Sequence, residues 1–369
     1  MDLARTLSKL IQAESPSGCE GPAAGVLMET LEAIGFSPRL DEAGNLEAVI
    51  GADGPEIVLT GHMDIVPPGD EAAWPHPPFS GQVEDGVIWG RGAVDMKGPL
   101  VGMMGALHRL KGERLPGRVR FLATVQEEVG GLGARHATKR LAPRAVILGE
   151  PSRNRVVRGN RGRGEIWADF SGDQGHAAIV DGNNALYALG RFLNDLEAHR
   201  EEDPAGLRHP SLRSAQLRLN PTVVECFPAT SNVLPGVARV ILDLRFDPGA
   251  DTDQLLRGLR ELAGDASVYV PEKVWSSGSV TMTIPMMYPP YHLEAEHPLL
   301  RRALEALDQP EAGFWPFTTD APYLGTLAPV IGYGPGDPAL AHTTHEHLHL
   351  ADLEQSAEDY ARLVRALLN

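Results

Sequence analysis

His62 and Asp64 are the residues whose types and spacing first suggest chemistry. They follow an apolar run, residues 57–60, that is typical of a buried strand ending at Gly61. Residues two apart in an extended backbone share one face, so the imidazole and the carboxylate can enter the same site. Imidazole is a common metal ligand, and a carboxylate on its second nitrogen fixes its orientation. On its own, however, the pair is more typical of a core histidine beside a loop aspartate.

Acidic residues follow the next three predicted strands in the same way. Because ligands of open α/β sheets bind beyond the carboxyl ends of the strands, side chains from successive strand ends are expected to meet. Two adjacent glutamates after a buried strand are costly unless a cation compensates them, although a solvated acidic loop is a common alternative. The recurrence over four strands favours a cation site. The acids that follow the later strands are Asp95, Glu127, Glu128 and Glu150.

A histidine-rich stretch near the C-terminus offers a further ligand. His342 follows a loop rich in glycine and proline, residues 332–337, of the kind that often carries function. We therefore expect His342 to be the last ligand of the site. His345, His347 and His349 are interpreted as residues of a solvated loop.

Composition excludes several classes of protein. The chain has 369 residues, more than one compact core usually takes, so two domains are expected. Its two cysteines, Cys19 and Cys226, cannot form a disulfide framework or a cysteine-based zinc knuckle, which leaves histidines and carboxylates as metal ligands. The formal charge of −16 argues against nucleic acid as a partner. Because no membrane-length apolar run and no signal-peptide core are found, we expect a cytoplasmic protein without a membrane partner.

Two α/β patterns divide the chain. Helices and strands alternate from the N-terminus to the fourth strand end, as in an α/β domain. The pattern then restarts in the order of a βαββαβ module, whose last strand is predicted at residues 277–284. We therefore expect a catalytic domain formed by residues 1–157 and 288–369, with a second domain inserted at residues 158–287.

Six motifs together resemble the dinuclear zinc ArgE/DapE/LysK family of N-acyl amino acid deacylases and carboxypeptidases. The resemblance implies a zinc-peptidase-like, three-layer α/β catalytic domain with an inserted ferredoxin-like α+β domain that serves as lid and dimerisation domain. The sequence departs from the family at residues 317–321, where members often carry a glycine-rich turn. The motifs are GHMDIVPPG, GRGAVDMKG, QEEVGG, GEPS, GH in the inserted domain, and YGPGD followed by AHTTHEH.

The resemblance also implies two zinc ions, with cobalt as a possible substitute. Asp64 would orient one of the histidine ligands, and Glu127 would act as the general base. Two cations that share a carboxylate activate water and polarise an amide carbonyl, and an unligated carboxylate beside them can accept the proton. The implied ligands are His62 and Glu150 at the first ion, Glu128 and His342 at the second, and Asp95 at both.

Three residues of the inserted domain complete the implied site. His176 matches the family histidine that stabilises the oxyanion, commonly across a dimer interface, so a homodimer is expected. The proline that often follows this histidine is absent here, and a packed structural histidine is the alternative. Asn232 and Arg245 match positions that hold the substrate carboxylate or support the domain. An arginine fork suits a carboxylate, but a strand-end arginine is often only a surface charge.

The resulting hypothesis is a metal-dependent amidohydrolase that cleaves N-acyl amino acids in arginine or lysine biosynthesis. It would deacetylate N-acetylornithine or N-acetyllysine or, if LysK-like, release lysine or ornithine from an acidic amino-group carrier protein. Five arginines in residues 153–163 could dock such a carrier, although a solvated interdomain connector is the simpler explanation. The alternatives are a metallo-carboxypeptidase or dipeptidase on the same scaffold, and a non-catalytic relative, which the complete ligand set disfavours.

Overall fold

The computed structural model describes residues 1–179, 182–201 and 217–369, which fall into two units. The expected domain boundaries, after residues 157 and 287, lie three residues before two of the unit boundaries. A short segment that was expected in the inserted domain, Val274–Met282, groups with the first unit instead. Unit 1 consists of Met1–Asn160, Val274–Met282 and Tyr291–Asn369, and unit 2 consists of Arg161–Lys273 and Thr283–Pro290.

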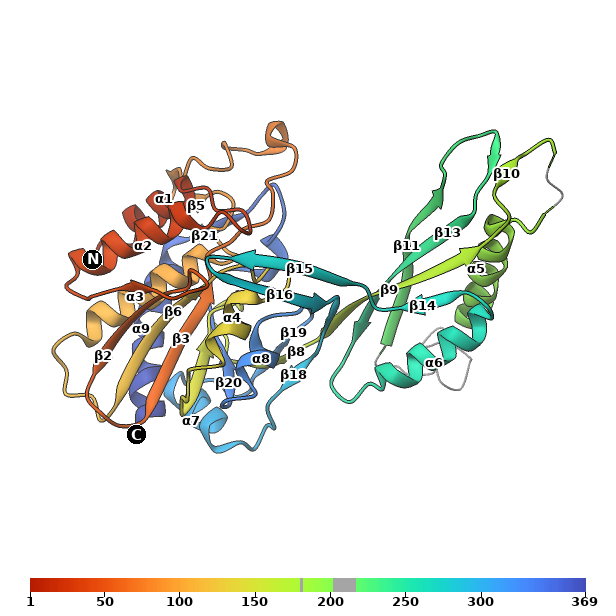
Figure 1. Ribbon diagram of the computed structural model, residues 1–369. Coiled ribbons are helices and arrows are strands. Elements are labelled where there is room, and N and C mark those ends of the chain that lie inside the picture. Colours follow the sequence, from red (N-terminus) through yellow and green to blue (C-terminus); the bar gives the residue numbers. More distant parts are fainter. Residues whose placement is uncertain (180–181, 202–216) are drawn as a thin grey trace. The chain divides into compact units, whose positions relative to one another are not determined.

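Unit 1 is organised around a mixed sheet whose central strands are parallel (Figure 1). In spatial order the strands are β1 (Arg39–Leu40), β2 (Leu46–Gly51), β6 (Arg118–Thr124), β3 (Glu56–His62), β7 (Ala145–Leu148), β20 (Val330–Gly332), β8 (Val157–Asn160) and β18 (Tyr291–His292), with β19 (Gly313–Trp315) beside β8. Strand β3 runs parallel to both β6 and β7. All of its residues are buried, as in parallel strands that helices cover on both faces. The common direction brings the carboxyl ends of these three strands to one edge of the sheet.

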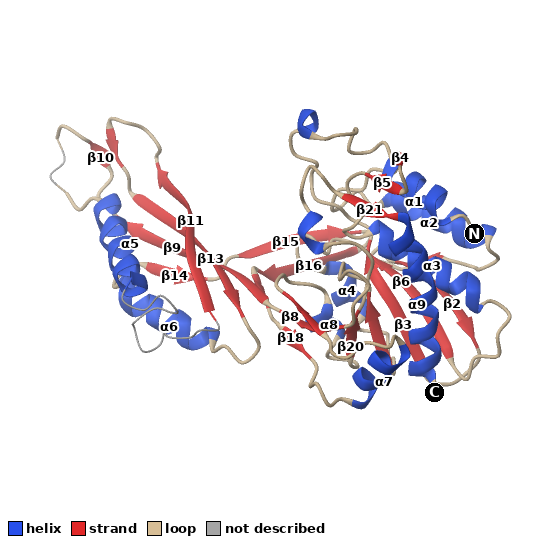
Figure 2. Cartoon of the chain, turned by 180° about the vertical axis from the view of Figure 1, so that it is seen from behind, coloured by secondary structure: helices blue, strands red, loops and turns tan. Residues whose placement is uncertain are grey.

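Helices cover both faces of this sheet, which confirms the three-layer α/β architecture (Figure 1, Figure 2). On one face, α3 (Lys97–Leu110) and α9 (Leu350–Leu368) pack against each other and against β3. On the other face, Val58, Leu122 and Val146 form a core with α4 (Leu132–Ala137) and α8 (Ala321–Leu324). Further helices of unit 1 are α1 (Leu3–Gln12), α2 (Gly21–Ala33) and α7 (Pro298–Ala306).

Asp95 reaches the sheet edge by a route that was not expected. The strand before it, β5 (Val87–Trp89), belongs to a separate small sheet with β4 (Val83–Glu84) and β21 (His347–His349). Asp95 directly precedes Met96, the N-cap residue of α3. The expectation that four strands of one sheet end in acids is therefore wrong for Asp95, which a loop and a helix start supply instead.

Unit 2 confirms the inserted βαββαβ module. Its sheet is antiparallel in the order β11-β13-β9-β14, which is the ferredoxin-like arrangement, and α5 and α6 pack on one face. Every second residue of β9 and β13 is buried against these helices. The elements are β9 (Gly162–Ser171), β10 (Gly175–His176), α5 (Ala185–Glu201), β11 (Leu217–Phe227), β12 (Val233–Leu234), β13 (Val237–Phe246), α6 (Thr252–Ala263), β14 (Ser267–Tyr269) and β17 (Met287–Tyr288). No helix in the described part of the chain is long and apolar enough to cross a membrane.

The strand predicted at residues 277–284 is instead the second half of a hairpin. Strands β15 (Glu272–Ser277) and β16 (Val280–Pro285) pair with each other, and the chain turns at Gly278, whose φ is +56°. The tip belongs to unit 1 because Ser277 Oγ donates to the Ala43 carbonyl at 2.6 Å and the Ser279 N–H donates to the Glu42 carbonyl at 2.9 Å. A polar Ser-Ser-Gly-Ser turn inside a β-branched stretch is easily taken for a continuous strand.

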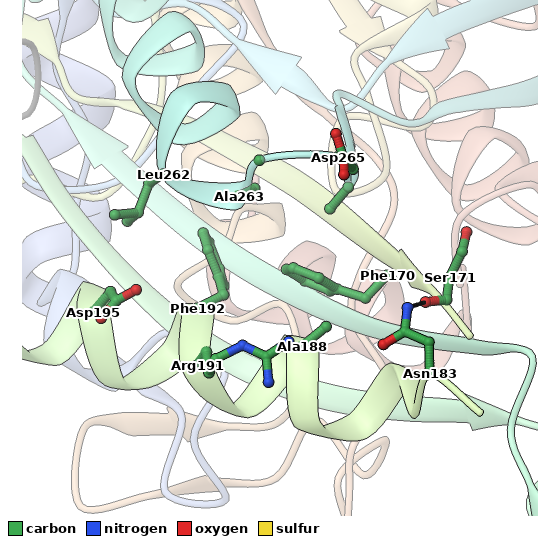
Figure 3. Close-up of a pocket in the computed structure, with 12 residues that line it drawn as sticks. Phe170, Ser171, Asn183, Ala188, Arg191, Phe192, Asp195, Leu262, Ala263 and Asp265 are labelled. Atoms are coloured by element: carbon green, nitrogen blue, oxygen red, sulfur yellow. Dashed lines mark hydrogen bonds between the residues drawn. The ribbon is translucent and has the colours of Figure 1, made fainter. Parts of the chain in front are cut away.

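A cavity of about 370 Å³ lies in unit 2 between α5 and the end of α6 (Figure 3). Phe170 and Phe192 line it with ring centroids 5.3 Å apart, and Arg191, Asp195 and Asp265 also face it. None of the site residues predicted from the sequence lines this cavity, so it is distinct from the candidate metal site described next.

Candidate metal centre

The carboxyl ends of the three parallel strands bring four predicted residues together. His62 is the last residue of β3, Glu127 and Glu128 follow β6, and Glu150 follows β7. Because β3 pairs with both neighbours in parallel register, these ends lie side by side. This is the arrangement in which we expected side chains from successive strand ends to meet.

Asp95 lies between two histidines and connects the ligands into two groups. Its Oδ1 is 3.0 Å from His62 Nε2, and its Oδ2 is 3.2 Å from His342 Nε2. Glu150 Oε1 lies 3.8 Å from the same nitrogen of His62, and Glu128 Oε1 lies 3.1 Å from that of His342. Each group of three offers ligand atoms within 4.8 Å of one another, and Asp95 belongs to both.

The donor chemistry of these two groups fits a pair of divalent cations. Carboxylate oxygens and imidazole nitrogens are the ligands that zinc and similar ions take in proteins. His62 and Glu150 are almost fully buried, with exposed fractions of 2% and 3%, and buried ionisable groups need a counter-charge. A carboxylate whose two oxygens face different histidines can bridge two ions.

Proton affinities in the cluster follow from these contacts. Burial opposes ionisation of Asp95, but hydrogen bonds with His342 and His62 outweigh it and lower the Asp95 pKa. Hydrogen bonds to Asp95 and Glu128 raise the pKa of His342 to about 10. Burial opposes a charge on His62, yet the carboxylates of Asp64 and Asp95, which lie 3.5 Å and 3.0 Å from its ring nitrogens, raise its pKa well above the ordinary value. Metal ions would therefore compete with protons for both imidazoles.

Glu127 belongs to neither ligand group. Burial raises its pKa well above the ordinary value, His62 opposes this shift, and the negative charges of Asp320, Glu150 and Glu128 add to it. A half-buried carboxylate with a raised pKa beside a metal centre is suited to accept and return a proton.

Asp64 contacts the loop that carries Glu127 more closely than it contacts His62. Its Oδ1 accepts the Glu127 N–H at 3.1 Å, and its Oδ2 accepts the Glu128 N–H at 3.2 Å and the Ser17 hydroxyl at 2.7 Å. His62 Nδ1 lies 2.9 Å from the main-chain oxygen of Asp64 but 3.5 Å from its carboxylate. The orientation of His62 therefore depends mainly on the main chain, and the Asp64 carboxylate fixes the glutamate loop.

Glu346 is a residue of the centre that sequence reasoning missed. Its fully buried carboxylate accepts the N–H of Val94 at 2.9 Å and of Asp95 at 3.1 Å, and it pairs with buried Arg91. Glu346 thus holds the main chain at Asp95, the carboxylate that the two ligand groups share. Glu346 lies in the histidine-rich stretch, where the histidines were considered as ligands and the glutamate was not. Arg91, in the same motif as Asp95, could have indicated it, since a buried guanidinium requires an acidic partner.

Asp320 is a second missed residue. Burial raises its pKa to about 7, and its Oδ2 accepts the Thr124 hydroxyl at 3.4 Å near the end of β6. It lies in the segment where the sequence departs from the family's glycine-rich turn, and it precedes α8. Asp320 is therefore a buried acid beside the centre.

Comparison with known proteins decides the family. Residues 58–366 match the Peptidase family M20/M25/M40. The chain belongs to this family. Succinyl-diaminopimelate desuccinylase of Parvibaculum lavamentivorans is 29% identical over 385 residues, covering 97% of this chain and 93% of that protein. The corresponding protein of Rhizorhabdus wittichii is 31% identical over 385 residues, covering 98% and 96%. An M20 family metallo-carboxypeptidase from Sulfolobus solfataricus has a TM-score of 0.76 at 18% identity, covering 100% and 99%.

Membership of the M20 family confirms the expected class of enzyme. The chain is a metal hydrolase that acts on amide bonds, and two groups of its described residues could each hold a metal ion. The resemblance drawn from the motifs is confirmed as well, and so is the α/β fold with its two modules.

In unit 2 of this M20 chain, His176 and Asn232 lie side by side. Strand β10 pairs with β12 so that His176 faces Val233, and the Ala177 N–H donates to the Asn232 carbonyl at 3.0 Å. His176 is exposed, and its Nδ1 accepts the Ala178 N–H at 3.1 Å. An exposed imidazole does not fit the alternative of a packed structural histidine.

Arg245 lies near the C-terminal end of β13, whereas the N-terminal end of this strand follows β12, the partner of the strand that carries His176. From Val237 to Arg245 this strand spans about 26 Å, at about 3.3 Å per residue. Arg245 is directly opposite Arg163 on β9 and Arg218 on β11, so three arginines form a row on one face of the sheet. Arg245 Nε also donates to Asp243 at 2.8 Å. Unit 2 therefore brings His176 and Asn232 together and keeps Arg245 apart from them.

The arginines of residues 153–163 do not form an unpaired basic patch. Four of them have an acidic partner within 4.0 Å, and Arg158 donates to the Leu293 carbonyl at 3.1 Å. Acidic neighbours therefore compensate most of the positive charge of these arginines. Docking of a carrier protein on this segment stays a prediction. The pairs are Arg153–Asp337, Arg155–Glu311, Arg161–Asp247 and Arg163–Asp243.

Proposed function

We propose that this M20 enzyme hydrolyses the N-acyl amide of an amino acid, with an N-succinyl diamino acid as the first candidate substrate. The observation that carries the proposal is the pair of ligand groups that share Asp95, with unligated Glu127 beside them. Bound divalent cations, zinc or cobalt, would polarise the amide carbonyl and lower the pKa of the attacking water.

Proton transfer in this proposal is the task of Glu127. Its carboxylate accepts a proton from the attacking water and returns it to the nitrogen of the departing amine. The raised pKa suits both steps, because a stronger base accepts the proton more readily and its acid form is still able to donate. Asp64 holds the Glu127 main chain while this occurs.

Two observations support an acidic acyl group. Two curated relatives that match nearly the whole chain, from Parvibaculum lavamentivorans and Rhizorhabdus wittichii, are named succinyl-diaminopimelate desuccinylase. In addition, the row of Arg163, Arg245 and Arg218 carries guanidinium groups of the kind that bind a free carboxylate, which a succinyl group has and an acetyl group lacks, although Arg163 and Arg245 also contact Asp243. N-acetylornithine, N-acetyllysine and a carrier-linked lysine are therefore the comparison substrates.

We propose further that the enzyme is a homodimer in which His176 of the partner subunit stabilises the oxyanion. The separation of about 26 Å along β13 supports this arrangement, because one rigid sheet cannot offer both of its ends to a single centre. Edge strand β11 supports it too, since it exposes Val223, Val224 and Phe227, and an apolar edge strand is a pairing surface.

Steady-state release of free amine by the zinc- or cobalt-loaded enzyme tests the proposed activity. The panel contains N-succinyl-diaminopimelate, N-acetylornithine, N-acetyllysine, a set of dipeptides and a γ-glutamyl-lysine carrier mimic. We expect the succinyl substrate to have the highest kcat/KM, and Glu127→Gln to lower its kcat by at least about 1,000-fold with both metal ions retained. Cleavage of dipeptides alone would instead establish a carboxypeptidase or dipeptidase.

A further inference from the structure

The loop that carries the proposed general base has a main chain that must be held in place. Gln126, the residue before Glu127, has φ of +56°, in the left-handed region that residues with a side chain seldom adopt. The loop follows the end of β6 directly, so this conformation determines where the next two carboxylates lie. Such a conformation persists only where surrounding contacts fix it.

Glu20 supplies one of these contacts. Its side chain is buried, with an exposed fraction of 5%, and its Oε1 accepts the N–H of Gln126 at 3.1 Å and of Gly18 at 2.8 Å. Among the described residues, no cationic side chain forms an ion pair with Glu20. A buried carboxylate without a counter-ion is costly. The hydrogen bonds of Glu20 with main-chain N–H groups explain why a carboxylate occupies this buried position.

Two carboxylates divide the consecutive N–H groups of this loop between them. Glu20 accepts that of Gln126, and Asp64 accepts those of Glu127 and Glu128. Ser17, from the same turn as Glu20, donates its hydroxyl to Asp64 and thereby connects the two acceptors. On the side chain of Gln126, Nε2 donates to the Ser276 carbonyl at 2.8 Å in the tip of the β15–β16 hairpin.

We infer that Glu20 is a positioning residue for Glu127. By accepting the Gln126 N–H, it stabilises the left-handed conformation from which Glu127 reaches the metal centre. Its catalytic consequence rests on the proposed function, whereas its contact with the loop does not. Without this acceptor the buried Gln126 N–H loses its partner, and the loop relaxes away from the geometry that proton transfer requires.

Substitutions at Glu20 in the metal-loaded, full-length enzyme test this inference. Glu20→Ala removes the acceptor, whereas Glu20→Gln keeps an oxygen at the same place. We expect Glu20→Ala to lower kcat by about 10- to 100-fold, with KM within about twofold and both metal ions retained. The Glu20→Gln variant should have a kcat within about threefold of that of the wild type. Glu14→Ala is the matched control, because it removes an exposed carboxylate from the same segment.

Hydrogen exchange over residues 120–131 gives a readout that does not depend on turnover. Glu20→Ala should exchange faster there than the wild type, and Glu14→Ala should not. If Glu20→Ala does not fold, Glu20→Asp, whose carboxylate is one methylene short of the loop, provides the same comparison. Unchanged exchange and kcat, or loss of metal together with kcat, would overturn the inference. Faster exchange in an enzyme whose wild type cleaves no substrate of the panel would support the positioning role and reject the proposed function.

Discussion

Both ligand groups of the centre depend on a single residue, Asp95, since its two oxygens face different histidines. Asp95→Asn preserves the size of the side chain but removes its charge and one acceptor oxygen. We expect the purified variant to retain at most about one metal ion per chain and to lose at least about 1,000-fold in kcat/KM. Metal analysis after gel filtration, with steady-state assays, measures both. Two tightly held ions in Asp95→Asn would contradict the shared carboxylate.

The metal-free centre should release protons when it binds zinc. With a pKa of about 10, His342 carries a proton at neutral pH, and the raised pKa of His62 leads to the same state. Only neutral imidazole binds metal, so ligation displaces these protons and the apparent affinity should rise with pH up to about 10. Calorimetric titration in two buffers with different heats of ionisation counts the protons. An affinity that does not change between neutral and alkaline pH would contradict the assignment.

The candidate metal ligands could be picked out from the sequence, whereas the residues that hold the main chain could not. His62, Glu128 and Glu150 lie at or just after the ends of apolar strands, and this pattern can be recognised in the sequence without knowledge of the fold. Glu346 and Glu20 instead contact N–H groups of segments far away in the sequence. Any acid could accept such a hydrogen bond, so no residue type or spacing marks Glu20, and Arg91 indicates only that some acid such as Glu346 must lie beside it.

At the scale of elements, register explains which parts of the site were foreseeable. Parallel pairing of β3 with β6 and β7 follows from uninterrupted apolar runs, which the sequence displays openly. The hairpin β15–β16 was missed because its turn is held by tertiary contacts, among them the hydrogen bond from the Ser279 N–H to the Glu42 carbonyl. Asp95 was assigned to a strand end for a related reason, since nothing local distinguishes β5 of the small sheet from a strand of the large one.

The start of α3 should tolerate no side chain at Gly98. A Cβ there would overlap the Ala93 carbonyl in the loop that leads to Asp95. Gly98→Ala should therefore destabilise the protein by about 1–3 kcal/mol, as overpacking does, and weaken metal binding because the Asp95 loop must shift. Urea unfolding and metal titration measure the two effects.

The matched control for this substitution is Gly25→Ala in α2, where an added Cβ meets no atom within 4 Å. A helical alanine in open space should be neutral or stabilise the protein by up to about 1 kcal/mol. If both substitutions changed the free energy of unfolding equally, the overlap of a Cβ at Gly98 with the Ala93 carbonyl would not be the cause of the destabilisation.

At the scale of the whole molecule, the proposed dimer makes each centre depend on two chains. His176→Ala and Glu127→Gln should each inactivate their own homodimer. In a mixed dimer, one centre combines an intact Glu127 with an intact His176 of the partner subunit, whereas the other centre has neither. After subunit exchange in an equal mixture, about half of the dimers are mixed and about a quarter of wild-type activity should return.

Recovery of activity separates action across the dimer from action within one chain. If His176 served the centre of its own chain, no combination of the two variants would restore a complete site, and mixing would leave activity at the sum of the two inactive enzymes. Val224→Lys supplies the control, because a charge on the exposed edge strand β11 should block pairing and abolish recovery. Sedimentation of that variant should give a monomer that still binds two metal ions, since all five predicted ligands belong to unit 1.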